Sequence, residues 1–155
     1  MVWQNKELNK YPEIILSDCS ISSIYLETNK IIVDFSKYGF VKKSSSDNKY
    51  YCTDGARIIV EECDIDNISI KEIRMQRLNE EEYFETMYDI EPSKFGKNIN
   101  DGKWKLEIVE EFYATEKAFF VGQIRTKESN FWCQIKIYYK NLVYLWNDLR
   151  YDCPF

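Results

Sequence analysis

The sequence predicts a mainly β, α+β fold: an antiparallel two-layer sandwich or partly open barrel, with one or two short helices between its halves. Aromatic and β-branched residues are plentiful, with 12 tyrosines and 9 phenylalanines among 155 residues, and such residues favour strands. Several segments alternate apolar and polar side chains with a period of two, as half-buried strands do. A chain of this length suits a single domain with one core, which we expect to span residues 1–155.

The C-terminal third carries the clearest strand pattern. Four strands are predicted at residues 104–112, 118–125, 131–139 and 142–147. Lys140-Asn141 has the composition of a two-residue hairpin turn, since Asn tolerates positive φ. That turn would pair the last two strands and place Ile137 opposite Tyr144 on the inner face.

The N-terminal half predicts further strands around turns and one polar loop. A hairpin is expected at 18–27 and 30–35, followed by strands at 38–41, 56–62 and 66–75 and a flexible loop at 42–49. Residues 18–26 and 62–70 share the pattern acid-Cys-x-Ile-x-x-Ile-x-aliphatic, which predicts structurally equivalent strands.

Two helices are expected between the halves. Asn79 precedes three glutamates, and this order is typical of a capped helix start. Pro92 is suited to opening a second short helix and Gly102 to ending it.

Glu110 is an anomaly of the predicted sheet, because strict alternation places it on the inner face in register with Phe120. A buried carboxylate must be hydrogen-bonded, lie at the rim or hold its proton. It is either an acid of raised pKa in a cleft or a rim residue satisfied by a Tyr hydroxyl or backbone. With Tyr144, it would form the polar contacts of an inner-face cavity.

The outer face of the same sheet is unusually apolar. Its expected members are Val109, Phe119, Val121, Trp132, Tyr138, Val143 and Leu145, beside Lys136. A patch of this kind is either a partner-binding surface or a face that the predicted helices cover.

Charge and cysteine content limit the partner classes and the compartment. The net charge of −5 and the absence of basic clusters among the aromatics predict no nucleic-acid partner and suit a basic protein. Five cysteines without a C-x-x-C pair indicate reduced thiols, so we expect a cytoplasmic protein. No signal-peptide pattern or membrane-spanning apolar run is found, and no membrane association is expected.

Residues for most catalytic chemistries are missing from the sequence. Without histidine, Ser-His and Cys-His nucleophile systems and His-based metal sites are excluded, and no Gly-rich phosphate loop occurs. Glu61, Glu62, Asp64 and Asp66 form an acidic run, either a solvated edge or a Ca²⁺ or Mg²⁺ site. Paired-acid hydrolysis would require one of them to approach Glu110. We expect no cofactor, no metal site and no catalytic residue, which favours a non-enzymatic role.

Several stretches resemble small uncharacterised proteins of low-GC Gram-positive bacteria. They are Asp18-Cys19 with Ile21 and Ile24, Asp34-Phe35, Gly39-Phe40, residues 104–113 and residues 134–139. This resemblance implies no activity or site residue. The size and acidity are also similar to those of immunity proteins that neutralise bacterial toxins.

These observations support three functional hypotheses in order of preference. The first is a non-catalytic protein-interaction module, immunity-like or self-associating, that binds through Glu107, Glu111, Trp132 and Tyr138. The second is a small-ligand carrier with its cavity near Glu110, and the third is a carboxylate-dependent hydrolase.

Overall fold

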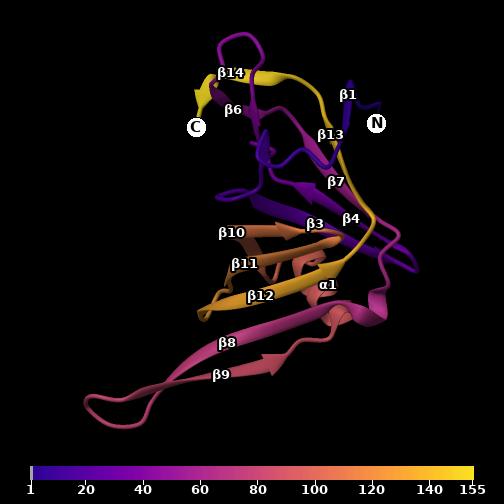
Figure 1. Ribbon diagram of the computed structural model, residues 1–155. Helices are drawn as coiled ribbons and strands as arrows, with labels where there is room; N and C mark the ends of the chain where they lie inside the picture. The colour runs from indigo at the N-terminus through magenta and orange to yellow at the C-terminus, as the bar shows by residue number, and fades with distance from the viewer. Residues whose placement is uncertain (1) are drawn as a thin grey trace.

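The computed structural model describes residues 2–155 and shows a mainly β protein of two antiparallel sheets and one α-helix (Figure 1). The larger sheet contains β1 (Asn5–Leu8), β3 (Ser20–Glu27), β4 (Lys30–Phe35), β7 (Ala56–Glu61), β8 (Ser69–Arg77), β9 (Tyr83–Asp89), β10 (Lys105–Ala114), β11 (Lys117–Arg125), β12 (Asn130–Tyr138) and β13 (Asn141–Trp146). The smaller sheet contains β2 (Ile14–Ile15), β5 (Val41–Lys43), β6 (Tyr50–Thr53) and β14 (Leu149–Pro154). The helices are α1 (Pro92–Asn100) and the short 3-10 helix η1 (Ile65–Asn67). The predicted fold class is confirmed in its sandwich form.

The strand order of the larger sheet is β1-β13-β7-β4-β3-β10-β11-β12-β8-β9. β10, β11 and β12 form the predicted meander, but β12 does not pair with β13. Instead β13 crosses to the other half of the sheet and lies between β7 and β1. The expected Lys140-Asn141 hairpin is therefore wrong, although the inner faces of both strands are as predicted, with Ile135, Ile137 and Tyr144 buried.

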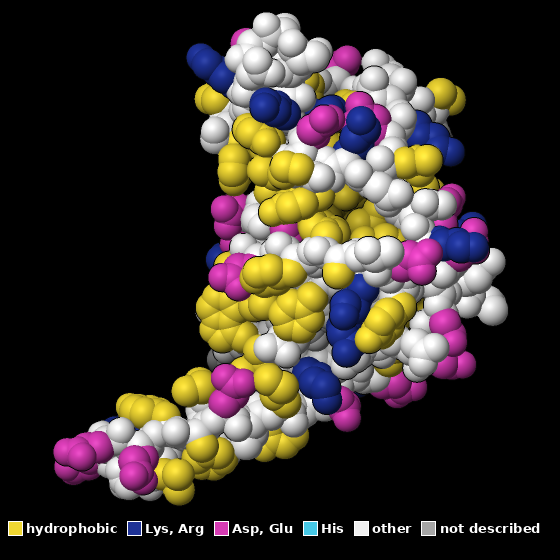
Figure 2. Space-filling view, viewed as in Figure 1, with side chains coloured by type: hydrophobic (Ala, Val, Ile, Leu, Met, Phe, Trp, Pro, Cys, Tyr) yellow, Lys and Arg dark blue, Asp and Glu magenta, His cyan; other side chains and the backbone are white. Residues whose placement is uncertain are grey.

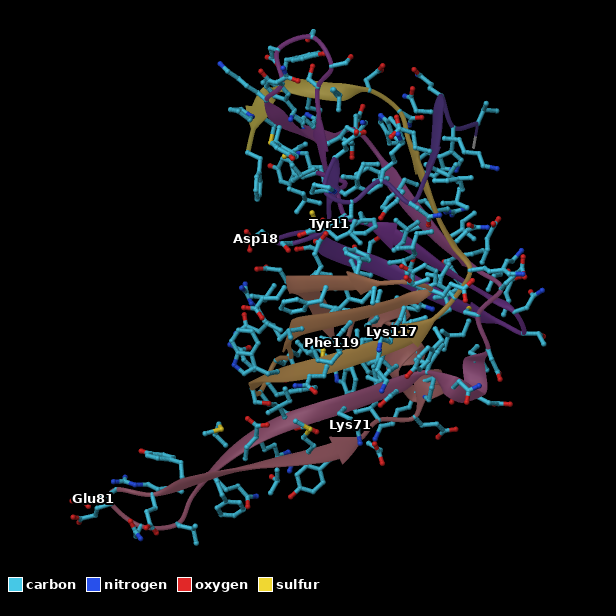
Figure 3. The ribbon with its side chains drawn as sticks, viewed as in Figure 1. Tyr11, Asp18, Lys71, Glu81, Lys117 and Phe119 are labelled. Atoms are coloured by element: carbon cyan, nitrogen blue, oxygen red, sulfur yellow. The ribbon has the colours of Figure 1, made fainter. Side chains whose placement is uncertain are left out.

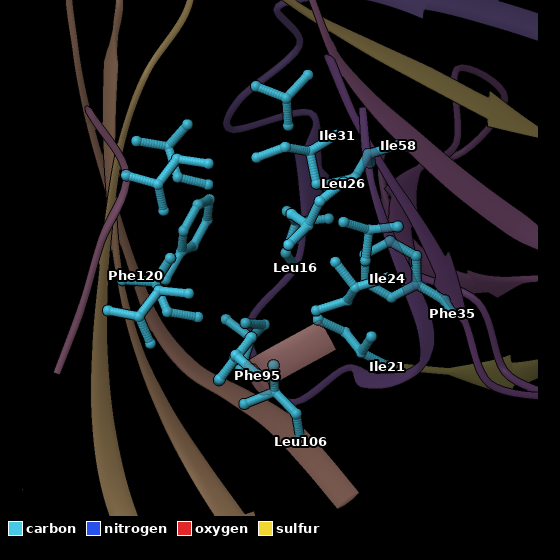
Figure 4. A pocket seen from close by; sticks show the side chains of 17 residues that line it. Leu16, Ile21, Ile24, Leu26, Ile31, Phe35, Ile58, Phe95, Leu106 and Phe120 are labelled. Carbon is cyan, nitrogen blue, oxygen red and sulfur yellow. The ribbon is translucent and has the colours of Figure 1, made fainter. Parts of the chain in front are cut away.

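The larger sheet bends so that its two halves face each other across one apolar interior. Aliphatic side chains of β3, β4 and β7 form one wall, and those of β8, β10, β11 and β12 form the other (Figure 4). Phe40, directly before β5 of the smaller sheet, also belongs to this core. Its ring contacts the Tyr144 ring edge-on at a centroid distance of 5.8 Å. The inner sides of both halves therefore pack into a single core.

The helix α1 is the element that Pro92 and Gly102 predict, with Gly102 at φ 72° after its end. It packs on β3, where the Asn100 side chain accepts a hydrogen bond from Ile24 N at 2.8 Å and donates one to Ile24 O at 2.7 Å. Phe95 is buried in the interior. Because α1 packs on β3, the alternative in which the helices cover the outer face of the C-terminal strands is excluded.

The helix predicted from Asn79 is also not formed. Asn79 Oδ1 does accept bonds from Glu81 N (2.9 Å) and Glu82 N (3.0 Å), as a cap would, but the segment turns back as the tip of the β8–β9 hairpin. Side-chain bonds of this kind close turns as readily as they start helices. The residues that follow then alternate along β9.

The two segments with the shared acid-Cys pattern have the same backbone conformation only at their start. Asp18 and Glu62 both adopt positive φ (63° and 52°), and the cysteine that follows each is buried. From there residues 20–27 form β3, whereas residues 65–67 form η1, so the predicted equivalence of the strands is wrong beyond the first two residues.

We predict opposite stability effects for alanine at two glycines. At Gly122 a Cβ would lie 2.7 Å from Leu106 Cδ1 and 3.2 Å from Glu107 O, so Gly122→Ala should lower the free energy of unfolding by about 1–3 kcal/mol. At Gly96, inside α1, a Cβ would meet nothing closer than 3.5 Å, and Gly96→Ala should raise it by about 0.5–1 kcal/mol. Urea unfolding of both variants measures these changes, and equal effects would contradict the packing described.

Candidate interaction surface

The outer face of β10, β11 and β12 carries a group of exposed aromatic side chains. Trp132 and Tyr138 lie there as the alternation predicts, 43% and 45% exposed, and Phe112 is 54% exposed. Phe112 and Phe119 pack together with ring centroids 6.1 Å apart. In the space-filling view hydrophobic side chains gather over these strands, and Phe119 lies beside Lys117 (Figures 2 and 3).

Two lysines border this aromatic face. The Nζ atoms of Lys117 and Lys136 lie 5.9 and 5.5 Å from the centroid of the Tyr138 ring. Val143 and Leu145, which the predicted hairpin would have added to the face, lie in β13 in the other half of the sheet. The aromatic outer face is therefore smaller than predicted, with two lysines beside Tyr138.

The same face continues onto β8 and β9 through cross-strand neighbours. Trp132 is opposite Ile73, which is opposite Met87 on β9, so these three side chains form one row. Gln134, Lys71 and Asp89 form the next row, with an ion pair of 2.9 Å between Lys71 Nζ and the Asp89 carboxylate. The face thus extends from β10 to the edge of the sheet.

β8 and β9 project from the body as a two-stranded arm (Figure 1). Six of its large apolar side chains are between 37% and 65% exposed: Met75, Leu78, Tyr83, Phe84, Met87 and Tyr88. The tip carries Glu80, Glu81 and Glu82, which Figure 2 shows as acidic groups at the far end of the molecule. The arm is not predicted from the sequence, where its signal is an acidic turn between apolar segments.

A β-bulge between Ile108 and Glu110 changes which glutamate faces inward. After the bulge Glu110 is opposite Val121 and Glu111 is opposite Phe120. Glu110 is exposed and Glu111 is only 7% exposed, so the predicted inner-face position of Glu110 is wrong. The same shift exposes Phe112, which the alternation placed inside. Bulges insert one unpaired residue in this way and reverse the facing of all that follows.

Glu111 holds the segment between β2 and β3 against β10. Its Oε2 accepts hydrogen bonds from the backbone nitrogens of Leu16 (2.6 Å) and Ser17 and from Ser17 Oγ (3.0 Å). Its Oε1 accepts one from the Tyr113 hydroxyl at 3.3 Å. Burial raises the pKa of Glu111, although these hydrogen bonds oppose the rise. Glu111 is therefore unavailable for the surface role predicted from the sequence.

Glu107 remains near the surface but is not a free carboxylate. Its Oε2 lies 3.5 Å from Arg125 Nη2 on the neighbouring strand. Of the four predicted binding residues, Trp132 and Tyr138 share the outer face with Glu107, and only Glu111 lies in the interior.

A pocket of about 340 Å³ opens at the end of the interior beside Glu111. It is lined by four tyrosines, Tyr11, Tyr113, Tyr139 and Tyr144, together with Asn9, Ala114, Thr115, Glu116, Lys140 and Leu142. The Tyr11 and Tyr113 rings lie 4.7 Å apart. The Tyr144 hydroxyl is fully buried and has no hydrogen-bond partner among the described residues. Burial raises the pKa of both Tyr113 and Tyr144, so both hydroxyls keep their protons at neutral pH.

The apolar interior contains a second, smaller cavity of about 60 Å³ (Figure 4). Leu16, Leu106 and Phe120 are among the residues that line it, and all of them are apolar. Ligand pockets are typically about 300–1,000 Å³, so this space is a packing gap between the two walls. It is not the ligand cavity that the carrier hypothesis placed on the inner face.

Groups that could support catalysis are dispersed or protonated. Burial raises the pKa of Cys19 and Cys133 to about 12, so these thiols are poor nucleophiles. Within residues 2–155 no cluster of three or more acidic or cysteine side chains could hold a metal ion. Glu62 and Asp64 share a groove with Glu116 and Lys140, and Glu110 does not line it.

Comparisons with family models, curated proteins and solved structures found no match to this chain. In the part of the chain that the structure describes, no helix has the length and apolar character needed to cross a bilayer.

We predict that Glu111 makes stability depend on pH in a defined direction. Because burial raises its pKa in the folded state, the folded protein holds this proton to higher pH than the unfolded chain does. The stability of the native protein relative to Glu111→Gln should therefore fall as pH rises from below the ordinary glutamate pKa through the raised one. Urea unfolding of both proteins from pH 4 to pH 8 measures the difference.

A separate variant checks the hydrogen bonds of Glu111. Glu111→Ala would leave the Leu16 and Ser17 backbone nitrogens without acceptors and should cost about 2–3 kcal/mol across this range. A native protein that gains stability over Glu111→Gln as pH rises would show that the hydrogen bonds outweigh burial.

Proposed function

We propose that this protein is a non-catalytic interaction module that binds a basic protein partner through the β8–β9 arm and the aromatic outer face joined to it. The observation that carries the proposal is the arm itself. Six large apolar side chains stay exposed on a hairpin that no second layer supports. Exposed apolar surface of this extent on a monomer marks an interaction site.

The composition of the surface suits protein recognition. Trp and Tyr dominate the binding energy of many interfaces, and Trp132, Tyr138, Tyr83 and Tyr88 are all exposed. The acidic tip at residues 80–82 adds a charged end to the apolar flanks, on a chain of net charge −5. Charge of this kind increases the association rate with a basic partner. Immunity proteins that bind toxins combine the same size and acidity.

We place the module in the bacterial cytoplasm, on the basis of the family resemblance and three buried free cysteines. Cys19, Cys63 and Cys133 are buried free thiols, whereas the Sγ atoms of Cys52 and Cys153 lie 2.7 Å apart. Reduced buried thiols are usual in cytosolic proteins.

A second function is favoured by one observation, the pocket of about 340 Å³ that four tyrosine side chains line in part. We propose that the pocket binds a small planar molecule stacked against the tyrosine rings. Glu111 lies behind Tyr113 and fixes its hydroxyl.

Benzamide titration tests the pocket. It is a neutral planar molecule, and its binding can be followed by chemical-shift changes. Tyr11→Ala removes one ring that lines the pocket and should weaken binding about three- to tenfold, the contribution of one aromatic contact. Tyr25→Ala, on an exposed side chain of β3, is the matched control. Equal binding by the two variants, or no binding by the native protein, would reject the site.

For the interaction module, a photo-crosslinking amino acid introduced in cells at Trp132 or Met87 should capture one predominant protein. The same amino acid at Tyr25, which is 49% exposed on β3, is the control position. Purification of the captured protein then allows its dissociation constant to be measured by titration. Trp132→Ala is expected to weaken that binding by about 2 kcal/mol or more, a loss typical of a central aromatic contact.

Charge reversal at the tip tests the choice of partner class. Replacing Glu80, Glu81 and Glu82 with lysine should slow association and remove most of its dependence on ionic strength, because steering forces are screened by salt. Equal capture at Trp132, Met87 and Tyr25 would contradict the proposed surface. Faster association of the lysine variant would contradict a basic partner.

A further inference from the structure

β9 is the last strand of the larger sheet, and half of its backbone groups face outward. Leu78 N donates to Glu82 O, and Ile90 N donates to Ile70 O, each at 2.8 Å. In an antiparallel pair the hydrogen-bonded positions recur at every second residue, so Phe84, Thr86 and Tyr88 bond to β8. The N–H and C=O groups of Tyr83, Glu85, Met87 and Asp89 therefore point to the free edge.

Apart from the acids Glu85 and Asp89, this edge lacks the features that protect most edge strands. Residues 83–89 contain no proline, no lysine and no bulge, and the strand pairs regularly with β8 along its whole length. The opposite edge of the sheet, β1, is only four residues long and carries Lys6. A long unprotected edge with apolar side chains is a template for a further strand.

We infer that β9 binds β9 of a second copy of this chain, antiparallel, about a two-fold axis at Thr86. In this register Glu85 is opposite Met87 of the second copy, and Tyr83 is opposite Asp89. All four are positions whose backbone groups face outward, so each pair can exchange two hydrogen bonds. Phe84 is opposite Tyr88 of the second copy, which places aromatic side chains together on one face twice by symmetry.

The charges of β9 select this register over its neighbours. An axis at Glu85 would place two Glu85 carboxylates directly opposite each other. An axis at Met87 would place Glu85 opposite Asp89. Like charges directly opposite destabilise a strand pair. Of the axes at residues 85, 86 and 87, only the one at Thr86 pairs every outward-facing acid with a neutral side chain.

The dimer goes beyond the proposed function, since it would join two arms into one continuous sheet. The outer faces of both copies, each carrying the row of Trp132, Ile73 and Met87, would then lie on one double-length surface. A contact of one strand per copy is smaller than a standard interface. We therefore expect a dissociation constant in roughly the micromolar range.

Sedimentation velocity of the full chain between about 1 and about 500 µM tests the association. The native protein should shift from monomer to dimer across this range. Glu85→Pro removes an outward N–H that β8 does not use, so it should leave the fold intact and the protein monomeric. Met87→Glu should also abolish the dimer by opposing Glu85, and the double variant Glu85→Lys, Met87→Glu should restore it.

Single cysteines define the register. Thr86→Cys should form a disulfide-linked dimer on oxidation, because the symmetric pair at a non-hydrogen-bonded position brings the two Cα atoms to about 4.5 Å. Glu85→Cys and Met87→Cys should not, and the native protein controls for its own thiols. Crosslinking at position 85 or 87 instead of 86 would overturn the register.

A native protein that stays monomeric at every concentration, or a Glu85→Pro variant that still dimerises, would overturn the dimer. Neither result affects the proposed function, because crosslinking of a different protein at Trp132 does not need a second copy. Conversely, a dimer without any such partner would uphold the inference and reject the basic partner.

Discussion

The bend of the larger sheet around one apolar interior is the constraint on which the rest of the structure depends. Strands from both halves turn their apolar sides into the same core, and α1 is packed on β3 with Phe95 inside. The crossing of β13 to the far half completes this enclosure. With every large element committed to the interior, the described chain has none left to cover the outer face of β10–β12 or either side of the arm.

The bulge in β10 connects the apolar core to the polar contacts of Glu111. One extra residue at Val109 turns Glu111 inward, where it anchors the backbone of Leu16 and Ser17, and turns Phe112 out to join the aromatic face. A regular strand would instead have buried Phe112 and exposed Glu111. The bulge therefore creates both the buried carboxylate beside the tyrosine pocket and part of the outer surface.

The sequence predicts the buried faces of the core strands well because alternation depends only on which side of each strand is buried. Ile135, Ile137 and Tyr144 face inward whatever strand lies beside them, so their burial was predicted although the pairing of β12 with β13 was wrong. Pairing is decided by contacts between distant segments, here β13 with β7 and β1. Local turn propensity at Lys140-Asn141 and at Asn79 carries no information about those contacts. The inversion at Glu110 was missed for the same reason, since nothing in the sequence marks the bulge.

The structure of the β8–β9 arm suits binding more than stability. A two-stranded hairpin with both faces in water buries little apolar area, so its order adds little to the stability of the core. Arg74, paired with Glu72 and stacked 4.8 Å from the Tyr88 ring centroid, stiffens one side of it. A hairpin ordered before binding loses less conformational entropy when a partner strand or surface is added. The exposed apolar residues of β8 and β9 are thus held in the extended form that an added strand requires.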